Sequence, residues 1–178
     1  MFHGPFDESI IKRAVDKGII DIHLINIRDF ATDRHKSVDD RPYGGGAGMI
    51  LRVDVLDRAI QSVPVPSYKI LLDPAGKRFS QADARVYARK HRAITLICGH
   101  YEGIDDRIRT LADTVLSIGD FVLTGGELPA MVVVDAMSRL VPGVLKSEEA
   151  AADESFETDS RGTHLLSYPQ YTRPKEYR

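Results

Sequence analysis

Apolar and polar residues follow one another along this chain in blocks that predict helices alternating with strands. Residues 8–17 repeat apolar side chains at helical spacing and stop at Gly18, which suits the end of a helix, so we expect a short amphipathic helix there. In residues 20–24, isoleucine and leucine alternate with polar residues, which predicts a strand. The chain therefore opens with a helix followed by a strand.

Further along, helical patterns alternate with short apolar runs. Helices are expected at residues 54–63, 80–91, 104–112 and 127–140, and extended segments at residues 68–73, 93–98 and 115–123. Ser80 is suited to cap the helix at 80–91. Pro74 and Gly76 should end the extended segment at 68–73. Strands that alternate with helices predict an α/β fold with a mainly parallel sheet.

One segment between these elements is too long and too polar to be a simple connection. Residues 29–49 have no helical or strand periodicity and end in a glycine-rich run, Gly44 to Gly48. Loops of about 20 residues are usually functional or disordered. The glycines follow a loop rather than a strand, and the chain has neither a Walker loop nor a Gly-x-Gly-x-x-Gly turn, so a P-loop NTPase or an ordinary dinucleotide fold is disfavoured.

The most informative stretch is residues 117–130, where an apolar run meets Gly125 and Gly126 just before a long apolar helix. Glycines can adopt positive φ and bring bare backbone close to a ligand, so a stiff, backbone-lined cup is expected; a tight turn with glycines for steric reasons is the plainer interpretation. Pro129 fits the first turn of the helix. That helix is apolar almost all round, which predicts burial in the domain or at a subunit contact.

Three glycine-bearing segments each follow an apolar strand, at residues 72–76, 98–107 and 117–130. In an open α/β sheet, ligands bind beyond the carboxyl ends of the strands. We therefore expect the three loops to converge on one crevice, where backbone amides could hold a flat heteroaromatic ligand.

Composition narrows the possibilities further. The chain has 178 residues, of which 43% are hydrophobic, so one principal domain is expected. A net charge of -2 gives no overall basic signature, so any contact with nucleic acid must come from local clusters. The single cysteine, Cys98, excludes an internal disulfide and a cysteine-rich zinc site, and it lies in an apolar run, which predicts a buried thiol and a reducing, cytoplasmic setting. No membrane span and no signal region are evident.

Four segments, at residues 39–49, 98–105, 117–131 and 168–174, closely resemble the bacterial tRNA (guanine-N1-)-methyltransferase family, with matching blocks in order along the chain. The resemblance implies an S-adenosylmethionine-dependent enzyme of the SPOUT class, with an open, mainly parallel sheet, helices on both faces and a deep trefoil knot. It further implies a cytoplasmic homodimer with its active site at the subunit interface, which methylates the guanine immediately 3′ of the anticodon of tRNA. Knots are nearly absent from proteins, and periodicity alone would not predict one here.

The resemblance also assigns residues to the methyl donor, whose site would lie in the cup described above. The implied contacts, mostly through the backbone, are Leu71, Leu72, Pro74, Gly99, Tyr101, Glu102, Gly103, Ile118, Gly119, Asp120, Phe121, Val122, Leu123, Gly125, Gly126 and Pro129.

Two further roles follow from the same resemblance. Arg139 matches the family's catalytic arginine, which would stabilise charge on the guanine O6; its spacing from Asp135 also suits an ordinary helical ion pair. The family's general base precedes a Ser-Phe pair, here Ser155-Phe156, which places Glu154 on the base position by register and leaves Asp153 as the alternative by residue type. A glutamate reaches further by a methylene, which matters because small misplacements can reduce rates by about 10²-fold.

Metal and RNA contacts are less specific in the sequence. Family members use Mg²⁺, for which Glu102 and Glu154 are candidate ligands, but two or three carboxylates do not define a metal site. For tRNA, the densest basic group before the C-terminus is expected to be Arg34, His35, Lys36 and Arg41, beside Tyr43. Contacts to phosphate and stacking on a flipped base are the physical uses of such residues.

The match departs from the family pattern at both ends. The first strand and most of a C-terminal helical domain are expected to be missing, which leaves a SPOUT domain at 1–145, a flexible linker at 146–167 and the start of a tRNA-binding domain at 168–178. The alternative function is therefore a catalytically weak or inactive fragment that binds the donor or RNA. A metal-dependent hydrolase is disfavoured because His and carboxylate ligands lack the required spacing.

Overall fold

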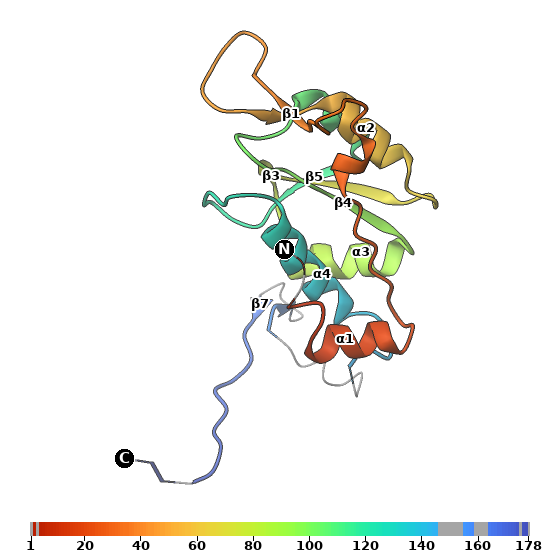
Figure 1. Ribbon diagram of the computed structural model, residues 1–178. Helices are drawn as coiled ribbons and strands as arrows, with labels where there is room; N and C mark the ends of the chain where they lie inside the picture. The colour runs from red at the N-terminus through yellow and green to blue at the C-terminus, as the bar shows by residue number, and fades with distance from the viewer. Residues whose placement is uncertain (1, 3, 146–154, 159–163, 175, 178) are drawn as a thin grey trace.

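The computed structural model describes residue 2 and residues 4–145, 155–158, 164–174 and 176–177. At its centre lies a parallel three-stranded sheet in the order β4-β3-β5 (Figure 1), made of β3 (Tyr68–Arg78), β4 (Ile94–Cys98) and β5 (Thr114–Ser117). The predicted α/β class with a parallel sheet is confirmed.

Helices cover both faces of this sheet. On one face, Leu71 and Ile97 pack in a core with α2 (Val53–Gln61), which contacts the 3-10 helices η1 (Ile27–Phe30) and η2 (Asp106–Leu111). The other face packs against α3 (Gln81–Lys90) and α4 (Glu127–Ser138) in a second core, whose members include Ile70, Leu72, Leu116, Tyr87, Ala130 and Val133. Three consecutive residues of β3, Ile70, Leu71 and Leu72, are therefore all buried, as expected for a strand that is covered on both sides.

The remaining elements are short. α1 (Ser9–Asp16) matches the first predicted helix, β1 (Asp39–Asp40) pairs antiparallel with β2 (Ile50–Leu51), and β6 (Glu157–Thr158) pairs with β7 (His164–Leu165). The predicted linker at 146–167 falls largely outside the described residues, so the three domain boundaries stay predictions. None of the helices in the described part of the chain has the length and apolar character that a bilayer crossing requires.

The predicted strand at residues 20–24 is wrong. Residues 21–26 have no regular structure, and Leu24 and Ile25 are 56% and 42% exposed. Alternation alone does not make a strand, because its backbone groups need a neighbouring strand, and no described strand pairs with this segment.

β3 does not end at Pro74, contrary to the prediction. It continues to Arg78, and its register with β5 shifts between Leu72 and Lys77. Proline lacks the N–H that a ladder needs, and Pro74 lies inside this irregularity, where no regular ladder bond is lost. A Cβ on Gly76 would lie 2.6 Å from the backbone of Leu116, so the absence of a side chain there lets the two strands approach.

Two more predictions need correction. The segment predicted as a helix at 104–112 forms the 3-10 helix η2, and the extended segment predicted at 115–123 stops at Ser117. The helices predicted at 54–63, 80–91 and 127–140 are confirmed as α2, α3 and α4, with ends that differ by up to two residues. Local periodicity and capping identified these three because such signals do not depend on distant partners.

Candidate functional site

Three loops meet at the carboxyl edge of the sheet, as predicted. Gly126 N–H donates to the carbonyl of Gly99 at 2.7 Å, and His100 and Gly125 form an isolated antiparallel bridge. The end of β3 joins them, because Arg78 forms an ion pair with Asp120. The loops after β4 and β5 and the distal part of β3, which contains the predicted loop at 72–76, therefore form one connected surface.

The glycine pair in this surface fits the steric interpretation of the sequence rather than the expected positive φ. Gly125 and Gly126 do not have positive φ; that of Gly126 is −81°. A Cβ on Gly126 would lie 2.8 Å from Cys98 Cα, and a Cβ on Gly125 would lie 2.8 Å from Nδ1 of His100. Both glycines are needed because the loop after β5 packs backbone to backbone against the loop after β4.

The loop between β5 and α4 does offer free backbone donors. The amides of residues 120–124 donate to no acceptor within the described residues, and Phe121, Val122 and Leu123 are exposed. Gly119 turns the chain into this loop with φ +152°, where a Cβ would press on the ring of Phe121. A ligand with several acceptors fits such a row of amides.

Tyr101 has an unfavourable backbone conformation in the neighbouring loop. Its φ is +58°, which a large side chain adopts only when its surroundings hold it, and such outliers cluster at ligand sites. Its hydroxyl lies 3.2 Å from Nη2 of Arg28, whose Nη1 donates to the carbonyl of Lys36 at 3.1 Å. Arg28, which sequence reasoning missed, thus connects the loop after β4 to the segment that holds Arg34, His35 and Lys36.

His100 and Glu127 form a second feature that sequence reasoning missed. Nδ1 of His100 is buried without a hydrogen-bond partner among the described residues, and it lies 3.5 Å from Oε1 of Glu127. The sequence signal was the presence of both residues in the resembling motifs, but only the fold brings them together. Cys98 is partly rather than fully buried, contrary to the prediction. Burial, aided by the charge of Glu127, raises the pKa of its thiol to about 12, which makes the thiol unreactive.

The hairpin that contains the glycine run packs on the same loops. The amide of Glu102 donates to the carbonyl of Met49 at 3.0 Å, and the side chain of Glu102 lies against Gly48. No group of three or more His, Cys, Asp or Glu side chains within the described ranges could hold a metal ion. Glu102 therefore belongs to no such group among the described residues, and Glu154 lies outside them.

The predicted catalytic residues are placed apart from the loops or are not described. Arg139 caps the far end of α4, and the 12 residues of this helix span about 18 Å. Gly126, at the other end, touches the loop after β4. Within one chain, Arg139 is therefore separated from the loop after β4 by the length of α4, and Asp153 and Glu154 lie outside the described residues.

The predicted tRNA-binding residues lie on the exposed segment that precedes and begins the hairpin. The Asp33 carboxylate accepts from Ser37 and His35, and these hydrogen bonds, led by the Ser37 hydroxyl, lower its pKa. This turn presents Arg34, His35 and Lys36 to solvent, although Lys36 also lies 3.8 Å from Asp29. Arg41 follows β1 and is exposed too.

The sequence led us to expect this group to be the densest basic cluster before the C-terminus, but that expectation is wrong. Residues 89–92 read Arg-Lys-His-Arg, at the end of α3. Counting basic residues in short windows would have found this run. Two hollows of the surface also lie near it, at the amino ends of the strands, and neither is lined by a residue of the three loops.

Comparison with known proteins shows that the whole chain matches one family. Residues 1–178 match a family model described as tRNA (Guanine-1)-methyltransferase TrmD. Among curated proteins, the tRNA (guanine-N(1)-)-methyltransferase of Carboxydothermus hydrogenoformans is 53% identical over 180 residues, which cover 100% of this chain and 69% of the relative. The protein of the same name from Syntrophomonas wolfei is 54% identical over 178 residues, covering 99% and 70%.

The architecture agrees with a solved structure as well. The crystal structure of tRNA (m1G37) methyltransferase from Aquifex aeolicus superimposes with a TM-score of 0.78 at 34% identity, covering 98% of this chain and 71% of that one. The similarity therefore extends over nearly all of this chain and about 70% of the proteins it resembles.

Proposed function

Because the chain belongs to the tRNA (guanine-1)-methyltransferase family, we propose that it transfers a methyl group to N1 of a guanine in tRNA. The observation that carries this proposal is the family match over residues 1–178. We place the target at the guanine immediately 3′ of the anticodon, take S-adenosylmethionine as the methyl donor, and expect the protein to act in the cytoplasm. A deep trefoil knot in the donor-binding region belongs to the same proposal.

The three loops suit an adenosyl group. The implied donor contacts at residues 71–74, 99–103 and 118–126 lie on the connected carboxyl edge of the sheet, and the amides of residues 120–124 are open to a ligand. Backbone donors fixed by strands cost little reorganisation when a ligand binds. The donor supplies an electrophilic methyl group on a sulfonium centre.

Side chains of this protein would accept the proton from guanine N1 and stabilise the negative charge on O6. As guanine N1 loses its proton to a carboxylate, N1 bonds to the methyl carbon, the sulfur–carbon bond breaks and S-adenosylhomocysteine leaves with the electron pair. We assign the carboxylate to Glu154, with Asp153 as the alternative, and assign Arg139 to the negative charge that develops on O6. No oxidant or reductant is needed.

The position of Arg139 supports an active site shared between two copies of the chain. Arg139 is separated from its own donor loops by the length of α4, about 18 Å. On the same helix, Leu128 and Val132 are 54% and 48% exposed and lie one turn apart, where a partner chain could cover them. We therefore propose a homodimer in which Arg139 of one chain faces the donor loops of the other. A Mg²⁺ ion held through Glu102 and Glu154 remains part of the proposal.

The test is transfer of a labelled methyl group from S-adenosylmethionine to unmodified tRNA. We expect incorporation into wild-type tRNA and none into a tRNA that carries adenosine in place of the target guanine. Glu154→Gln should lower the transfer rate by about 10²-fold or more while calorimetry shows an unchanged donor affinity. Asp153→Asn is the matched control and should keep most of the rate.

Two results would count against this proposal. Absence of incorporation by a folded wild-type protein would refute the activity. Full activity of both Glu154→Gln and Asp153→Asn would refute the assignment of the base while leaving the activity in place.

A further inference from the structure

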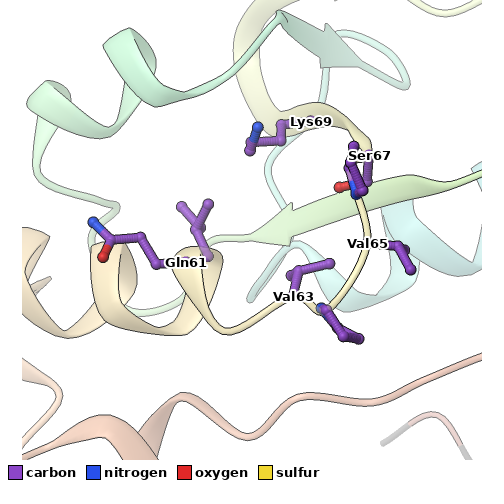
Figure 2. A pocket seen from close by; sticks show the side chains of 8 residues that line it. Gln61, Val63, Val65, Ser67 and Lys69 are labelled. Atoms are coloured by element: carbon purple, nitrogen blue, oxygen red, sulfur yellow. The ribbon is translucent and has the colours of Figure 1, made fainter.

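A furrow bordered by basic residues lies at the amino ends of the parallel strands, opposite the donor loops. Lys90, His91 and Arg92 line a hollow of about 350 Å³ together with Ser67 and Tyr68. A second hollow, of about 340 Å³, shares Pro66 and Ser67 with the first and extends to Lys69 (Figure 2). We call these two hollows, residues 63–69 and 90–92, together with Arg89 beside them in the last turn of α3, the basic furrow.

Figure 2 shows how three parts of the chain form one end of this furrow. Gln61 comes from the end of α2, Val63, Val65 and Ser67 from the connection, and Lys69 from the start of β3. Apolar side chains thus form the wall and a cation stands at its rim. A lysine at such a rim is placed to contact a phosphate.

The cations of the furrow are not neutralised by neighbours. Arg89, Lys90, Arg92 and Lys69 form no ion pair with any residue that the structure describes, whereas Lys77, Arg78, Arg107 and Arg109 are all paired with aspartates. One acid, Asp113, lines the first hollow, and its carboxylate accepts the backbone N–H of Lys69 at 2.7 Å. The local charge is therefore positive although the chain as a whole carries −2.

Helix electrostatics explains only part of this cluster. Arg89 and Lys90 occupy the last turn of α3, where cations favour the helix dipole. Arg92 follows the helix, and Lys69 belongs to β3, so neither serves that purpose. The ring of His91 stacks on Tyr68 with centroids 4.0 Å apart, which fixes the segment between α3 and β4 and holds Arg92 at the rim.

We propose that the basic furrow binds the phosphodiester backbone of the RNA substrate at a distance from the methylated base. The inference rests on the proposed function. The paired segment Tyr68–Leu72 separates the furrow from the donor loops by about 15 Å. The 10 residues of α3 bridge the same distance and carry Arg85 and Arg89 one turn apart. An RNA longer than a few nucleotides reaches both edges of the sheet.

The test compares two variants that remove the same charge. Arg89→Gln/Lys90→Gln/Arg92→Gln alters the furrow, and Lys12→Gln/Arg13→Gln/Lys17→Gln removes three exposed cations from α1 and the residue after it. Binding of unmodified tRNA is measured against KCl concentration. Each phosphate contact contributes about 0.7–0.9 to the slope of log affinity against log salt, so the furrow variant should lose about 2 from that slope and the α1 variant should not.

Calorimetry with S-adenosylmethionine separates this inference from the proposed function, because both variants should bind the donor as the wild type does. A furrow variant with the wild-type slope would overturn the RNA contact and leave the methyltransferase proposal intact. Equal loss of slope in both variants would also overturn it, since net charge would then be the cause. A wild-type protein that binds neither tRNA nor the donor would overturn both proposals.

Discussion

Gly126 lies where two backbones touch, and its lack of a side chain holds the loop after β5 against the loop after β4. Its N–H donates to the Gly99 carbonyl, and a Cβ would meet Cys98. The sequence marked this glycine for positive φ and an open backbone, with steric need as the plainer alternative, and the structure supports that alternative. The packing role appears only when the residues around 98 and 126 are brought together.

Substitution of Gly126 by alanine should separate the two loops. The new methyl group would lie 2.8 Å from Cys98 Cα and from Gly99 N, so the backbone must shift. We expect a loss of about 1–3 kcal/mol in the free energy of unfolding, together with at least a tenfold weaker affinity for S-adenosylmethionine. Chemical denaturation and calorimetry measure the two effects.

Gly45→Ala is the control for Gly126→Ala. No atom lies within 4 Å of the new Cβ there, although φ is +92°, so it should cost about 1–2 kcal/mol through backbone strain alone and leave donor affinity unchanged. If Gly126→Ala bound the donor as tightly as Gly45→Ala does, the packed glycine would not shape the donor site.

At the scale of elements, α3 shows how far local signals reach. Ser80 caps it as predicted, and Asp83 completes a capping box by accepting from the backbone of Ser80. Lys77 adds a contact from β3 at 2.5 Å to Oδ1 of Asp83. Burial raises the pKa of Asp83, but the hydrogen bonds from Lys77 and Ser80 outweigh burial and hold this pKa below its usual range.

Asp83→Asn should destabilise the fold in a pH-dependent way. An aspartate with a lowered folded pKa stabilises the protein above its unfolded pKa of about 3.9, and that contribution disappears as the pH falls through the folded value. We expect the variant to lose about 1–2 kcal/mol at pH 7 and to differ less from the wild type as the pH drops below about 4. Thermal unfolding across pH measures this difference.

Asp57→Asn is the matched control for Asp83→Asn on α2, where Asp57 accepts from the side chain of Gln61. It should change the free energy of unfolding by about 0.5 kcal/mol or less. A difference between Asp83→Asn and the wild type that stayed constant down to pH 2 would show that the charge of Asp83 does not contribute.

At the scale of the whole molecule, α4 is the element that is buried on one side and exposed on the other. Ala130 and Val133 are buried in the core below the sheet, whereas Leu128 and Val132 are about half exposed. The sequence predicted that this helix would be buried within the domain or at a subunit contact, and one chain buries only part of it. The uncovered part is where the proposed dimer would form.

Val132→Asp should weaken self-association by placing a charge on this uncovered side. We expect the wild type to sediment as a dimer and the variant to shift toward the monomer, with a fall in methyl transfer because Arg139 would no longer face a partner. Val86→Asp on α3, a residue that is 43% exposed, is the control and should stay dimeric. A Val132→Asp protein that remained fully dimeric would place the interface elsewhere.

The sequence by itself determined the helices α1 to α4, the apolar strands of a parallel sheet, and the loops that would meet at its carboxyl edge. These follow from periodicity, capping and chain direction, which act over a few residues. The family resemblance supplied the activity and the assigned residues.

Only the tertiary structure decided the rest. Residues 20–24 have the pattern of a strand but gain no partner, and β3 passes through Pro74 because its ladder is interrupted there. The approach of His100 to Glu127, the packing of Gly126 on Cys98 and the gathering of Lys69 with Arg92 all join residues far apart in the chain. Such contacts depend on how whole elements pack, and a local pattern of amino acids does not specify which distant residues will meet.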